Sequence, residues 1–421
     1  MYNIISLESL CKEIIDCPHS TPKWQNEGIP VIRNYNLKDG KIDCTNLSFV
    51  SEEDYNERVK RAIPEESDII ISREAPMGVV GIIPEGFQCC LGQRLVLLKI
   101  DKSKCIPTYL LYSLMSEYVQ LQIRRINRTG SIVSNLNISS LKELKILLHN
   151  FEEQSKIANI LSAIDDKIQI NNQINQELEA MAKILYDYWF VQFDFPDQNG
   201  KPYKSSGGKM IYNPELKREI PEGWGVEKLD DLGTIVGGST PTKSISDNFT
   251  KGGEGYSWIT PNDLSNNKGN KFIKNGEIDV TVRGLKDASL KLYPEGTVLM
   301  SSRAPVGYLA IATKELTTNQ GFKSFIPDKE YDKNYIYYTL QNCLKVIEQN
   351  ASGSTFKEIS ATVLKDITII QPNLDIVKKF EEKVSSINSY IKGNEEQNQE
   401  LTQLRDWLLP MLMNGQVKVE L

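Results

Sequence analysis

The feature that most constrains this chain is a helical stripe of apolar residues that reads the same in both directions. In residues 151–190 the apolar side chains recur in steps of four and three, which indicates a coiled-coil seam. They lie 3, 7, 10 and 14 positions on either side of Asn171. The stripe consists of Ile157, Leu161, Ile164, Ile168, Ile174, Leu178, Met181 and Leu185.

The same stripe occurs again 223 residues further on, around Asn394. Because each copy is symmetric about its centre, an antiparallel pair of the two brings apolar residues together throughout. We therefore predict a long antiparallel two-helix coiled coil with Asn171 near Asn394, since a buried Asn pair fixes register and orientation. The alternative is that each helix packs only against its own domain. The second stripe consists of Phe380, Val384, Ile387, Ile391, Gln397, Leu401, Leu404 and Leu408.

The residues outside the two helices repeat as well. DIIISREAPMG at 68–78 resembles VLMSSRAPVG at 298–307, and TYLLYSL at 108–114 resembles NYIYYTL at 334–340. Short apolar runs between turn residues predict strands in both segments. The order along the chain is therefore domain, helix, domain, helix.

These patterns predict an α+β fold in which a long antiparallel two-helix coiled coil holds apart two similar, mostly-β globular domains. Two similar halves whose helices pair in opposite directions also give the chain internal pseudo-twofold symmetry. The predicted parts are the first domain at 1–150, the first long helix at 151–192, a polar linker or ordered loop at 193–220, the second domain at 221–372 and the second long helix at 373–421.

The composition excludes several classes of protein. No apolar run approaches the roughly 18 residues of a membrane span, and the N-terminus lacks a basic signal region, so we expect a cytoplasmic protein without a membrane partner. Seven cysteines without a CxxC pair, and only His19 and His149 beside them, predict reduced thiols and no metal site. The net charge of −6 lies mostly on the first helix, because residues 151–195 carry 3 basic and 8 acidic groups. Phosphate binding would therefore depend on local basic clusters.

Matched loops in the two domains are the first candidates for contact with DNA. Arg33 and Asn34 in the first domain correspond to Thr260, Pro261 and Asn262 in the second, and their differing polar side chains suit the reading of base edges. Features held in both domains should support the architecture or bind phosphates, whereas positions that differ should carry sequence readout. A helix of about 40 residues spans roughly 60 Å, against about 34 Å for one DNA turn, so two separated half-sites can be read together.

The other candidate contacts are basic and hydroxyl side chains near predicted turns, where they suit phosphate oxygens. A single arginine or lysine is more often a solvated surface residue, so the prediction concerns the group. In the first domain these residues are Arg73, Arg94, Arg124, Arg125, Arg128, Thr129 and Ser131. In the second domain they are Arg283, Lys286, Arg303, Lys323, Ser352, Ser354 and Lys357.

The strings in the join between the two halves, FVQFDFP, GKPYKSSGGKM and ELKREIPEGW, resemble the DNA-specificity (S) subunit of type I restriction-modification systems. The resemblance extends over essentially the whole chain. It implies that each domain recognises one half of a bipartite site on double-stranded DNA. It also implies that the helices dock two methyltransferase (M) subunits, with restriction (R) subunits joining the assembly. One departure is that GQR at 92–94 stands where the second domain has NQG at 319–321.

The resemblance implies no catalytic residues and no cofactor of the chain's own, since S-adenosylmethionine, ATP and Mg would belong to the partner subunits. The residues agree: no Gly-rich cofactor loop precedes an Asn/Asp-Pro-Pro-aromatic motif, and GGKM at 207–210 lacks the hydroxyl of a phosphate loop. A Pro-Asp at 196–197 and Glu-x-Lys at 215–217 follow a nuclease pattern, but they lie in the polar linker. The alternative function is a coiled-coil structural adaptor that binds only protein partners.

Overall fold

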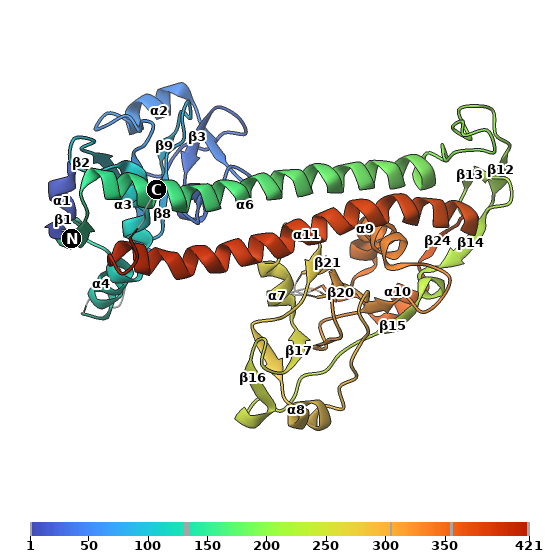
Figure 1. Ribbon diagram of the computed structural model, residues 1–421. Coiled ribbons are helices and arrows are strands. Elements are labelled where there is room, and N and C mark those ends of the chain that lie inside the picture. Colours follow the sequence, from blue (N-terminus) through green and yellow to red (C-terminus); the bar gives the residue numbers. More distant parts are fainter. Residues whose placement is uncertain (1, 130–134, 304, 354–356, 419–421) are drawn as a thin grey trace. The chain divides into compact units, whose positions relative to one another are not determined.

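The computed structural model describes residues 2–129, 135–303, 305–353 and 357–418. The chain forms two compact units, unit 1 from Met1–Ile168 with Gln399–Leu421 and unit 2 from Gln169–Asn398. Two long helices, α6 (Phe151–Tyr186) and α11 (Leu374–Met413), contribute residues to both units (Figure 1). Each unit combines strands with helices, as the sequence predicts.

Unit 1 is built around an antiparallel four-stranded sheet in the order β2-β10-β7-β8. A second sheet, β6-β3-β9, includes a parallel pair in which Ile32 lies opposite Leu91. The strands are β1 (Asn3–Ser6), β2 (Cys11–Asp16), β3 (Ile29–Ile32), β4 (Leu37–Lys38), β5 (Lys41–Ile42), β6 (Ser48–Val50), β7 (Ile69–Ser72), β8 (Val80–Ile82), β9 (Cys90–Leu91), β10 (Leu95–Ile100) and β11 (Lys145–Leu148). The short helices are α1 (Leu7–Leu10), η1 (Asn34–Asn36), α2 (Glu52–Arg58), α3 (Pro107–Met115), α4 (Glu117–Thr129) and α5 (Ile138–Glu143).

Unit 2 repeats this plan with longer sheets. Its five-stranded sheet has the order β15-β23-β20-β21-β18, and its four-stranded sheet, β16-β19-β17-β22, contains a parallel pair in which Ile259 lies opposite Thr318. The strands are β12 (Met210–Asn213), β13 (Arg218–Pro221), β14 (Gly225–Lys228), β15 (Thr234–Val236), β16 (Phe249–Lys251), β17 (Tyr256–Ile259), β18 (Phe272–Ile273), β19 (Ile278–Val280), β20 (Val298–Ser302), β21 (Val306–Ala312), β22 (Thr317–Thr318), β23 (Ser324–Ile326) and β24 (Thr368–Gln371). The helical segments are η2 (Asp187–Val191), η3 (Leu229–Leu232), η4 (Ser246–Asn248), α7 (Pro261–Asn266), α8 (Val282–Asp287), α9 (Lys333–Asn350) and α10 (Ala361–Lys365).

Each domain closes on itself at its ends, because its first and last strands pair with each other. In unit 1, β1 pairs antiparallel with β11, with Asn3 opposite Leu148. In unit 2, β14 pairs antiparallel with β24, with Gly225 opposite Gln371. The long helix follows the last strand directly in both cases.

The core of unit 1 joins the sheet to both long helices. Tyr109 and Leu110 of α3 pack in one buried cluster with Leu161 of α6 and Leu412 of α11. In unit 2 the corresponding cluster is aromatic, and the centroid of the Tyr186 ring lies 6.0 Å from that of Tyr335 and 5.8 Å from that of Phe380. Each domain is therefore packed on a helix pair in its own unit.

Beyond Asn171 the buried face of α6 differs from the predicted palindromic stripe, so that part of the prediction is wrong. Ile157, Leu161 and Ile164 are buried as expected, but Ile174 is 42% exposed and Met181 is 57% exposed. A palindromic stripe needs two successive steps of three residues at its centre. Six residues turn the helix by about 600°, which is 120° short of two full turns, so the stripe moves off the face that meets the partner helix. The seam instead continues its regular heptad through two small or polar residues, Asn175 and Ala182, both of which are buried.

In α11, too, the buried face moves by one residue from the predicted stripe after Asn394. Leu404 is 42% exposed, and Arg405, one position later, holds the buried seam with only 11% of its side chain exposed. The two long helices thus share a regular seam in place of a symmetric one.

Asn171 is fully buried, but its partner is not Asn394 as predicted. Its side-chain amide donates hydrogen bonds to Gln397 Oε1 at 2.8 Å and to Asn398 Oδ1 at 2.9 Å. Asn394 instead donates to Asn175 Oδ1 at 2.9 Å. The observed pairs lie about one helical turn beyond the predicted pairing, and the polar centre is a network of amides that sets the register.

The segment at 193–220, predicted as a polar linker or ordered loop, is ordered; it ends in a hairpin and has a buried aromatic side. Strands β12 and β13 pair antiparallel, and Phe193 and Phe195 are buried against Trp224, with the Phe195 and Trp224 rings stacked 5.0 Å apart. The sequence FVQFDFP therefore packs into the core of unit 2. In the described residues, no helix is both long and apolar enough to cross a membrane.

Candidate nucleic-acid interface

The loop that follows β3 presents Arg33 on a pinned backbone. Arg33 is extended, and its N–H donates to Asn36 Oδ1 at 3.0 Å at the start of η1. Asn36 is buried and donates in turn to the carbonyls of Asp43 and Asn46. Since an amide side chain satisfies three backbone groups here, the loop is held in one conformation.

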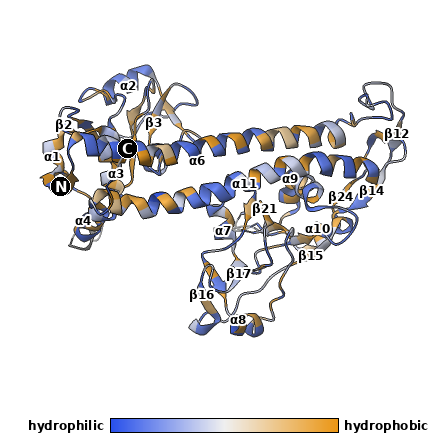
Figure 2. Ribbon diagram, viewed as in Figure 1, coloured by the Kyte–Doolittle hydropathy of each residue, from blue (hydrophilic) through white to orange (hydrophobic). Residues whose placement is uncertain are grey.

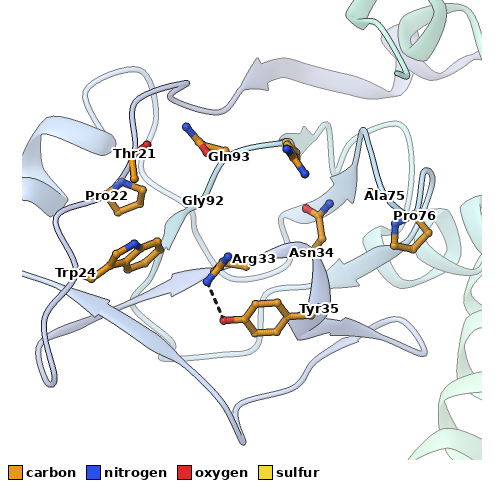
Figure 3. A pocket seen from close by; sticks show the side chains of 11 residues that line it. Thr21, Pro22, Trp24, Arg33, Asn34, Tyr35, Ala75, Pro76, Gly92 and Gln93 are labelled. Atoms are coloured by element: carbon orange, nitrogen blue, oxygen red, sulfur yellow. Dashed lines mark hydrogen bonds between the residues drawn. The ribbon is translucent and has the colours of Figure 1, made fainter. Parts of the chain in front are cut away.

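The Arg33 side chain lies between two exposed aromatic rings. Its guanidinium carbon is 5.2 Å from the centroid of Trp24 and 4.9 Å from that of Tyr35, distances typical of cation–π contacts. Arg33 Nη1 also donates to Tyr35 Oη at 3.3 Å (Figure 3). The rings are 45% and 53% exposed, which leaves the stack open to solvent.

A cavity of about 410 Å³ opens beside this stack. Figure 3 shows that its wall combines Arg33, Asn34 and Tyr35 with residues of two other loops, at 75–76 and 92–94. Asn34 donates its side-chain amide to the carbonyl of Glu74, and within the described residues its Oδ1 has no hydrogen-bond donor. The wall therefore offers the Arg33 guanidinium to a bound group, whereas Asn34 Oδ1 is buried.

The matched loop of the second domain follows β17 and uses the same backbone device. Thr260 N–H and its hydroxyl both donate to Asp263 Oδ2, at 2.7 and 2.6 Å, at the start of α7. Asp263 is buried, as is Asn36 at the corresponding position. Asn262 is exposed where the first domain has Tyr35. The two loops thus share a frame and differ in the side chains that they present.

A second pair of matched loops lies against the first. Gly92 N–H donates to the carbonyl of Ile32 at 2.7 Å, and Asn319 N–H donates to the carbonyl of Ile259 at 3.0 Å. A Cβ at Gly92 would lie 2.9 Å from that carbonyl oxygen and 3.2 Å from Arg33 Cγ, so only glycine fits this approach. GQR and NQG, which differ in sequence, therefore occupy equivalent places.

Two arginines of the first domain are already engaged with carboxylates. Arg73 Nη1 lies 2.7 Å from both oxygens of Asp16, its Nε donates to the carbonyl of Leu136, and only 12% of its side chain is exposed. Arg94 is 58% exposed and pairs with Glu74 at 3.1 Å. The structure gives Arg73 a role in holding the domain together, whereas Arg94 borders the cavity.

The basic cluster on α4 is placed only in part. Arg124 is about half exposed and pairs with Glu117, about two helical turns earlier, while Arg125 is exposed. The side chains of Arg128 and Thr129, and Ser131 as a whole, lie outside the described residues. The prediction that this cluster binds phosphates stays a prediction.

The candidates of the second domain fall on two sites. On α8, Arg283 pairs with Asp247 at 3.2 Å, and Lys286 is exposed. At the other site, Arg303 approaches Glu358 at 3.8 Å, and Lys323 lies nearby with its pKa lowered, chiefly by burial.

The remaining segment of the second domain is exposed where it is described. Ser352 N–H and Glu358 N–H each donate to the other residue's carbonyl, and Ser352 and Lys357 are both exposed. Ser354 lies outside the described residues.

Trp24 and Gln93 line the cavity, and sequence reasoning missed both. Trp24 stands in a polar stretch, after Lys23 and before Gln25, where nothing in the local pattern sets it apart. Its exposure is the only signal of a role, and exposure is not visible in the sequence.

Within the described ranges no group of three or more His, Cys, Asp or Glu side chains could hold a metal, and Asp197 accepts hydrogen bonds from the backbone of its own turn.

Comparison with known proteins connects both halves to one family. A family model described as the type I restriction modification DNA specificity domain matches residues 5–180 and 221–403. The chain is 28% identical over 377 residues to the HindI specificity subunit of Haemophilus influenzae, covering 77% of this chain and 80% of that protein. It is 38% identical over 205 residues to the MjaIX specificity subunit of Methanocaldococcus jannaschii, covering 47% of this chain and about half, 46%, of that relative.

A solved structure shares the fold. The crystal structure of the type I restriction-modification system S subunit from M. genitalium aligns with a TM-score of 0.56 at 16% identity. The alignment covers 100% of this chain and 97% of that one.

Proposed function

The chain belongs to the type I restriction modification DNA specificity family, and from this premise we propose that it reads a two-part site on double-stranded DNA, one half with each domain. Specificity subunits are the non-catalytic recognition subunits of these systems. We assign methyl transfer and ATP hydrolysis, with S-adenosylmethionine, ATP and Mg, to the partner subunits.

One observation carries the proposal: the two domains share the backbone conformation of a loop, but the exposed side chains on that loop differ. Arg33 and Thr260 both begin a short helix with a backbone N–H bonded to a buried side chain, yet one is a long cation and the other a small hydroxyl. Equal frames with unequal side chains suit the reading of two unequal half-sites, because base edges in the major groove are distinguished by donor and acceptor pattern. A protein adaptor would not need this contrast.

We propose further that α6 and α11 set the spacer between the half-sites. A helix of the length of α6, 36 residues, extends about 54 Å at 1.5 Å per residue. The polar centre around Asn171 fixes the register of the pair, so the length is defined.

A second apolar stripe on α6 supports docking of the methyltransferase subunits. Ile170, Ile174, Met181 and Ile184 of α6, followed by Tyr188 of η2, recur at heptad-like spacing on a face outside the seam and are 36 to 66% exposed. Figure 2 shows how apolar residues recur along the whole of this helix. A stripe of this spacing is the surface that a partner helix uses in a helical bundle.

The reading proposal is tested by selection from randomised duplexes with the complex of this chain and its methyltransferase subunits. We expect one enriched motif with two conserved parts around a spacer of fixed length, and binding that weakens steeply with salt. Inserting equal whole turns into both helices beside Asn171 and Asn394 should lengthen the spacer and leave the two parts unchanged. A pool without any enriched two-part motif would remove the proposal.

Docking is tested by Ile184→Glu, with Ile278→Glu as the control on an exposed apolar residue, 45% exposed, away from the helices. A buried charge at the centre of an interface costs enough to weaken retention of the methyltransferase subunit about tenfold or more. Retention is measured by co-purification and by titration. If both variants retain the partner equally well, the stripe is not the docking surface.

A further inference from the structure

We propose that Arg33, held between Trp24 and Tyr35, reads a guanine in the half-site of the first domain. The inference rests on the proposed function and names the base that this domain selects. It joins three observations on the cavity beside the β3 loop: an uncompensated charge, a fixed guanidinium plane and a hydrogen-bonding edge without a protein partner.

The charge of Arg33 is not neutralised by the protein. Arg73 and Arg94 of the same domain pair with Asp16 and Glu74, at 2.7 and 3.1 Å. For Arg33, by contrast, no carboxylate lies within ion-pair distance in the part of the chain that the structure describes. An exposed cation without a counter-charge is suited to an electronegative partner from outside, such as the major-groove edge of guanine.

The plane of the guanidinium is fixed by its surroundings. The rings of Trp24 and Tyr35 lie 5.2 and 4.9 Å from its carbon, and Nη1 donates to Tyr35 Oη at 3.3 Å. Tyr35 Oη also forms a hydrogen bond of 3.3 Å with Ser48 Oγ, which restrains the ring. An arginine that is ordered before binding loses little conformational entropy when it makes its hydrogen bonds.

The edge that remains matches one base. Within the described residues, Nε and Nη2 of Arg33 have no acceptor, so two parallel N–H groups are available. Guanine presents two acceptors, N7 and O6, on its major-groove edge, and bidentate pairing with arginine is the commonest specific contact of this kind. Adenine offers an acceptor and a donor there, and the donor would oppose an arginine N–H.

The second domain does not repeat this device. Thr260 occupies the position of Arg33, and its hydroxyl is used to bond Asp263. Asn262, at the position of Tyr35, has no ring to stack a guanidinium. The two half-sites should therefore differ at the position that faces this loop, with guanine selected only by the first domain.

The test uses the complete complex with its methyltransferase subunits and a randomised duplex pool. The variants are Arg33→Lys, which keeps the charge but loses the planar pair of donors, and Trp24→Leu, which removes one wall of the stack. Lys23→Ala is the control, because it removes an exposed charge from the same segment. The second half-site serves as an internal control for folding and assembly.

We expect the wild-type motif to contain a guanine in one half. Arg33→Lys should lose about tenfold of the preference for that guanine over other bases while the other half stays unchanged. Trp24→Leu should show a smaller loss in the same position, and Lys23→Ala none. A guanine preference retained by Arg33→Lys, or lost equally in Lys23→Ala, would overturn the inference while the two-part motif still stands. A wild-type pool without any motif would instead overturn the proposed function.

Discussion

In unit 1 the domain meets the long helices at a buried aspartate. Asp165 of α6 accepts a hydrogen bond from the hydroxyl of Tyr112 at 2.6 Å and one from Arg405 of α11 at 2.9 Å. In unit 2 the same task is done with other residues, and the comparison shows which parts of the junction are interchangeable.

The junction of unit 2 centres on a buried lysine from the domain. Lys271 Nζ donates to Glu179 of α6 and to Asn388 of α11, both at 2.9 Å, and also bonds the hydroxyl of Tyr338. Only 3% of the lysine side chain is exposed. Burial lowers the pKa of Lys271 to about 8, an effect that the nearby carboxylate Glu179 opposes.

The tyrosine is common to the two junctions, and the cation is not. Tyr112 and Tyr338 occupy matched positions in the repeated motif. The cation comes from helix α11 in unit 1, as Arg405, and from the domain in unit 2, as Lys271. Gly40 occupies in unit 1 the backbone position that Lys271 occupies in unit 2. The carbonyl of Lys271 accepts a hydrogen bond from Ile311 N–H of β21, and the carbonyl of Gly40 accepts one from Ile82 N–H of the equivalent strand β8. Both junctions thus combine a tyrosine hydroxyl, a carboxylate and a cation, but only the tyrosine position is repeated. At the offset of 223 residues Asp165 corresponds to Asn388, and the carboxylate of unit 2 is Glu179.

Substitution of Lys271 should cause the largest loss of stability at either junction. Lys271→Met removes the donor to the buried Asn388 Oδ1 and one of the donors to Glu179, which keeps the hydrogen bond from Tyr338. We expect this loss to destabilise unit 2 by about 3 kcal/mol. Hydrogen exchange measured by peptide separates the two units, and the loss of protection should appear in unit 2. Lys274→Met, an exposed control three residues away, should change little. Equal effects of the two variants would contradict the proposed importance of the cluster.

Arg405→Met should act in the same way on unit 1, but less strongly. Asp165 keeps the hydrogen bond from Tyr112, as Glu179 keeps the one from Tyr338. Arg405 donates to one buried side chain, Asp165, whereas Lys271 donates to Asn388 as well as Glu179, so we expect a smaller loss of about 2 kcal/mol. The same exchange experiment should now report lost protection in residues 107–115 and 151–168, with β18 and α9 unchanged. Loss in unit 2 instead of unit 1 would show that the junctions are not independent.

A change of pH should alter the stability of the two units unequally, by a smaller amount than the two substitutions above. In unit 2, burial raises the pKa of Glu227, Glu381 and Glu395 to about 7 each. The folded state then holds protons that the unfolded state releases above pH 4.5, so this stabilisation is present at low pH and is lost as pH rises through 7. In unit 1, by contrast, hydrogen bonds with Thr45 lower the pKa of Asp43.

We therefore expect unit 2 to lose more protection than unit 1 between pH 5.5 and 7.5, after correction for the intrinsic exchange rate. Glu227→Gln should reduce that difference, since the carboxyl that accepts from Tyr331 no longer titrates. An identical pH response of the variant and the wild type would exclude Glu227 as a source.

Much of the architecture was predictable because it depends on periodicity and repetition. The α6 helix begins at Phe151, where the periodic stretch of the sequence begins, and the repeat of Tyr112 as Tyr338 identifies equivalent elements from the sequence alone. The seam was predictable only as far as Asn171. Beyond it, Ile174 and Met181 belong to a second apolar stripe, and a sequence pattern cannot say which of two stripes faces the partner helix.

The candidate site was less predictable, because the fate of a charged side chain depends on residues far away in the chain. Arg73 is bound to Asp16, 57 positions earlier, and nothing near Arg73 announces that pair. Arg33 was identified as a candidate from its loop, yet its aromatic neighbour Trp24 was missed. Matching the two domains gave the positions that differ, and only the structure showed which side chains are available.

The pairing of the first strand of each domain with its last has a consequence for how such a chain changes over time. Since Asn3 lies opposite Leu148 and Gly225 lies opposite Gln371, the chain enters and leaves each domain at neighbouring points. Exchange of the whole segment between such a strand pair replaces one domain as a closed piece. Both long helices keep their own sequences, and with them the amide register at Asn171. On the proposed function, recombination at these two strand pairs would therefore change the base preference of one domain in a single step and leave that of the other domain unchanged.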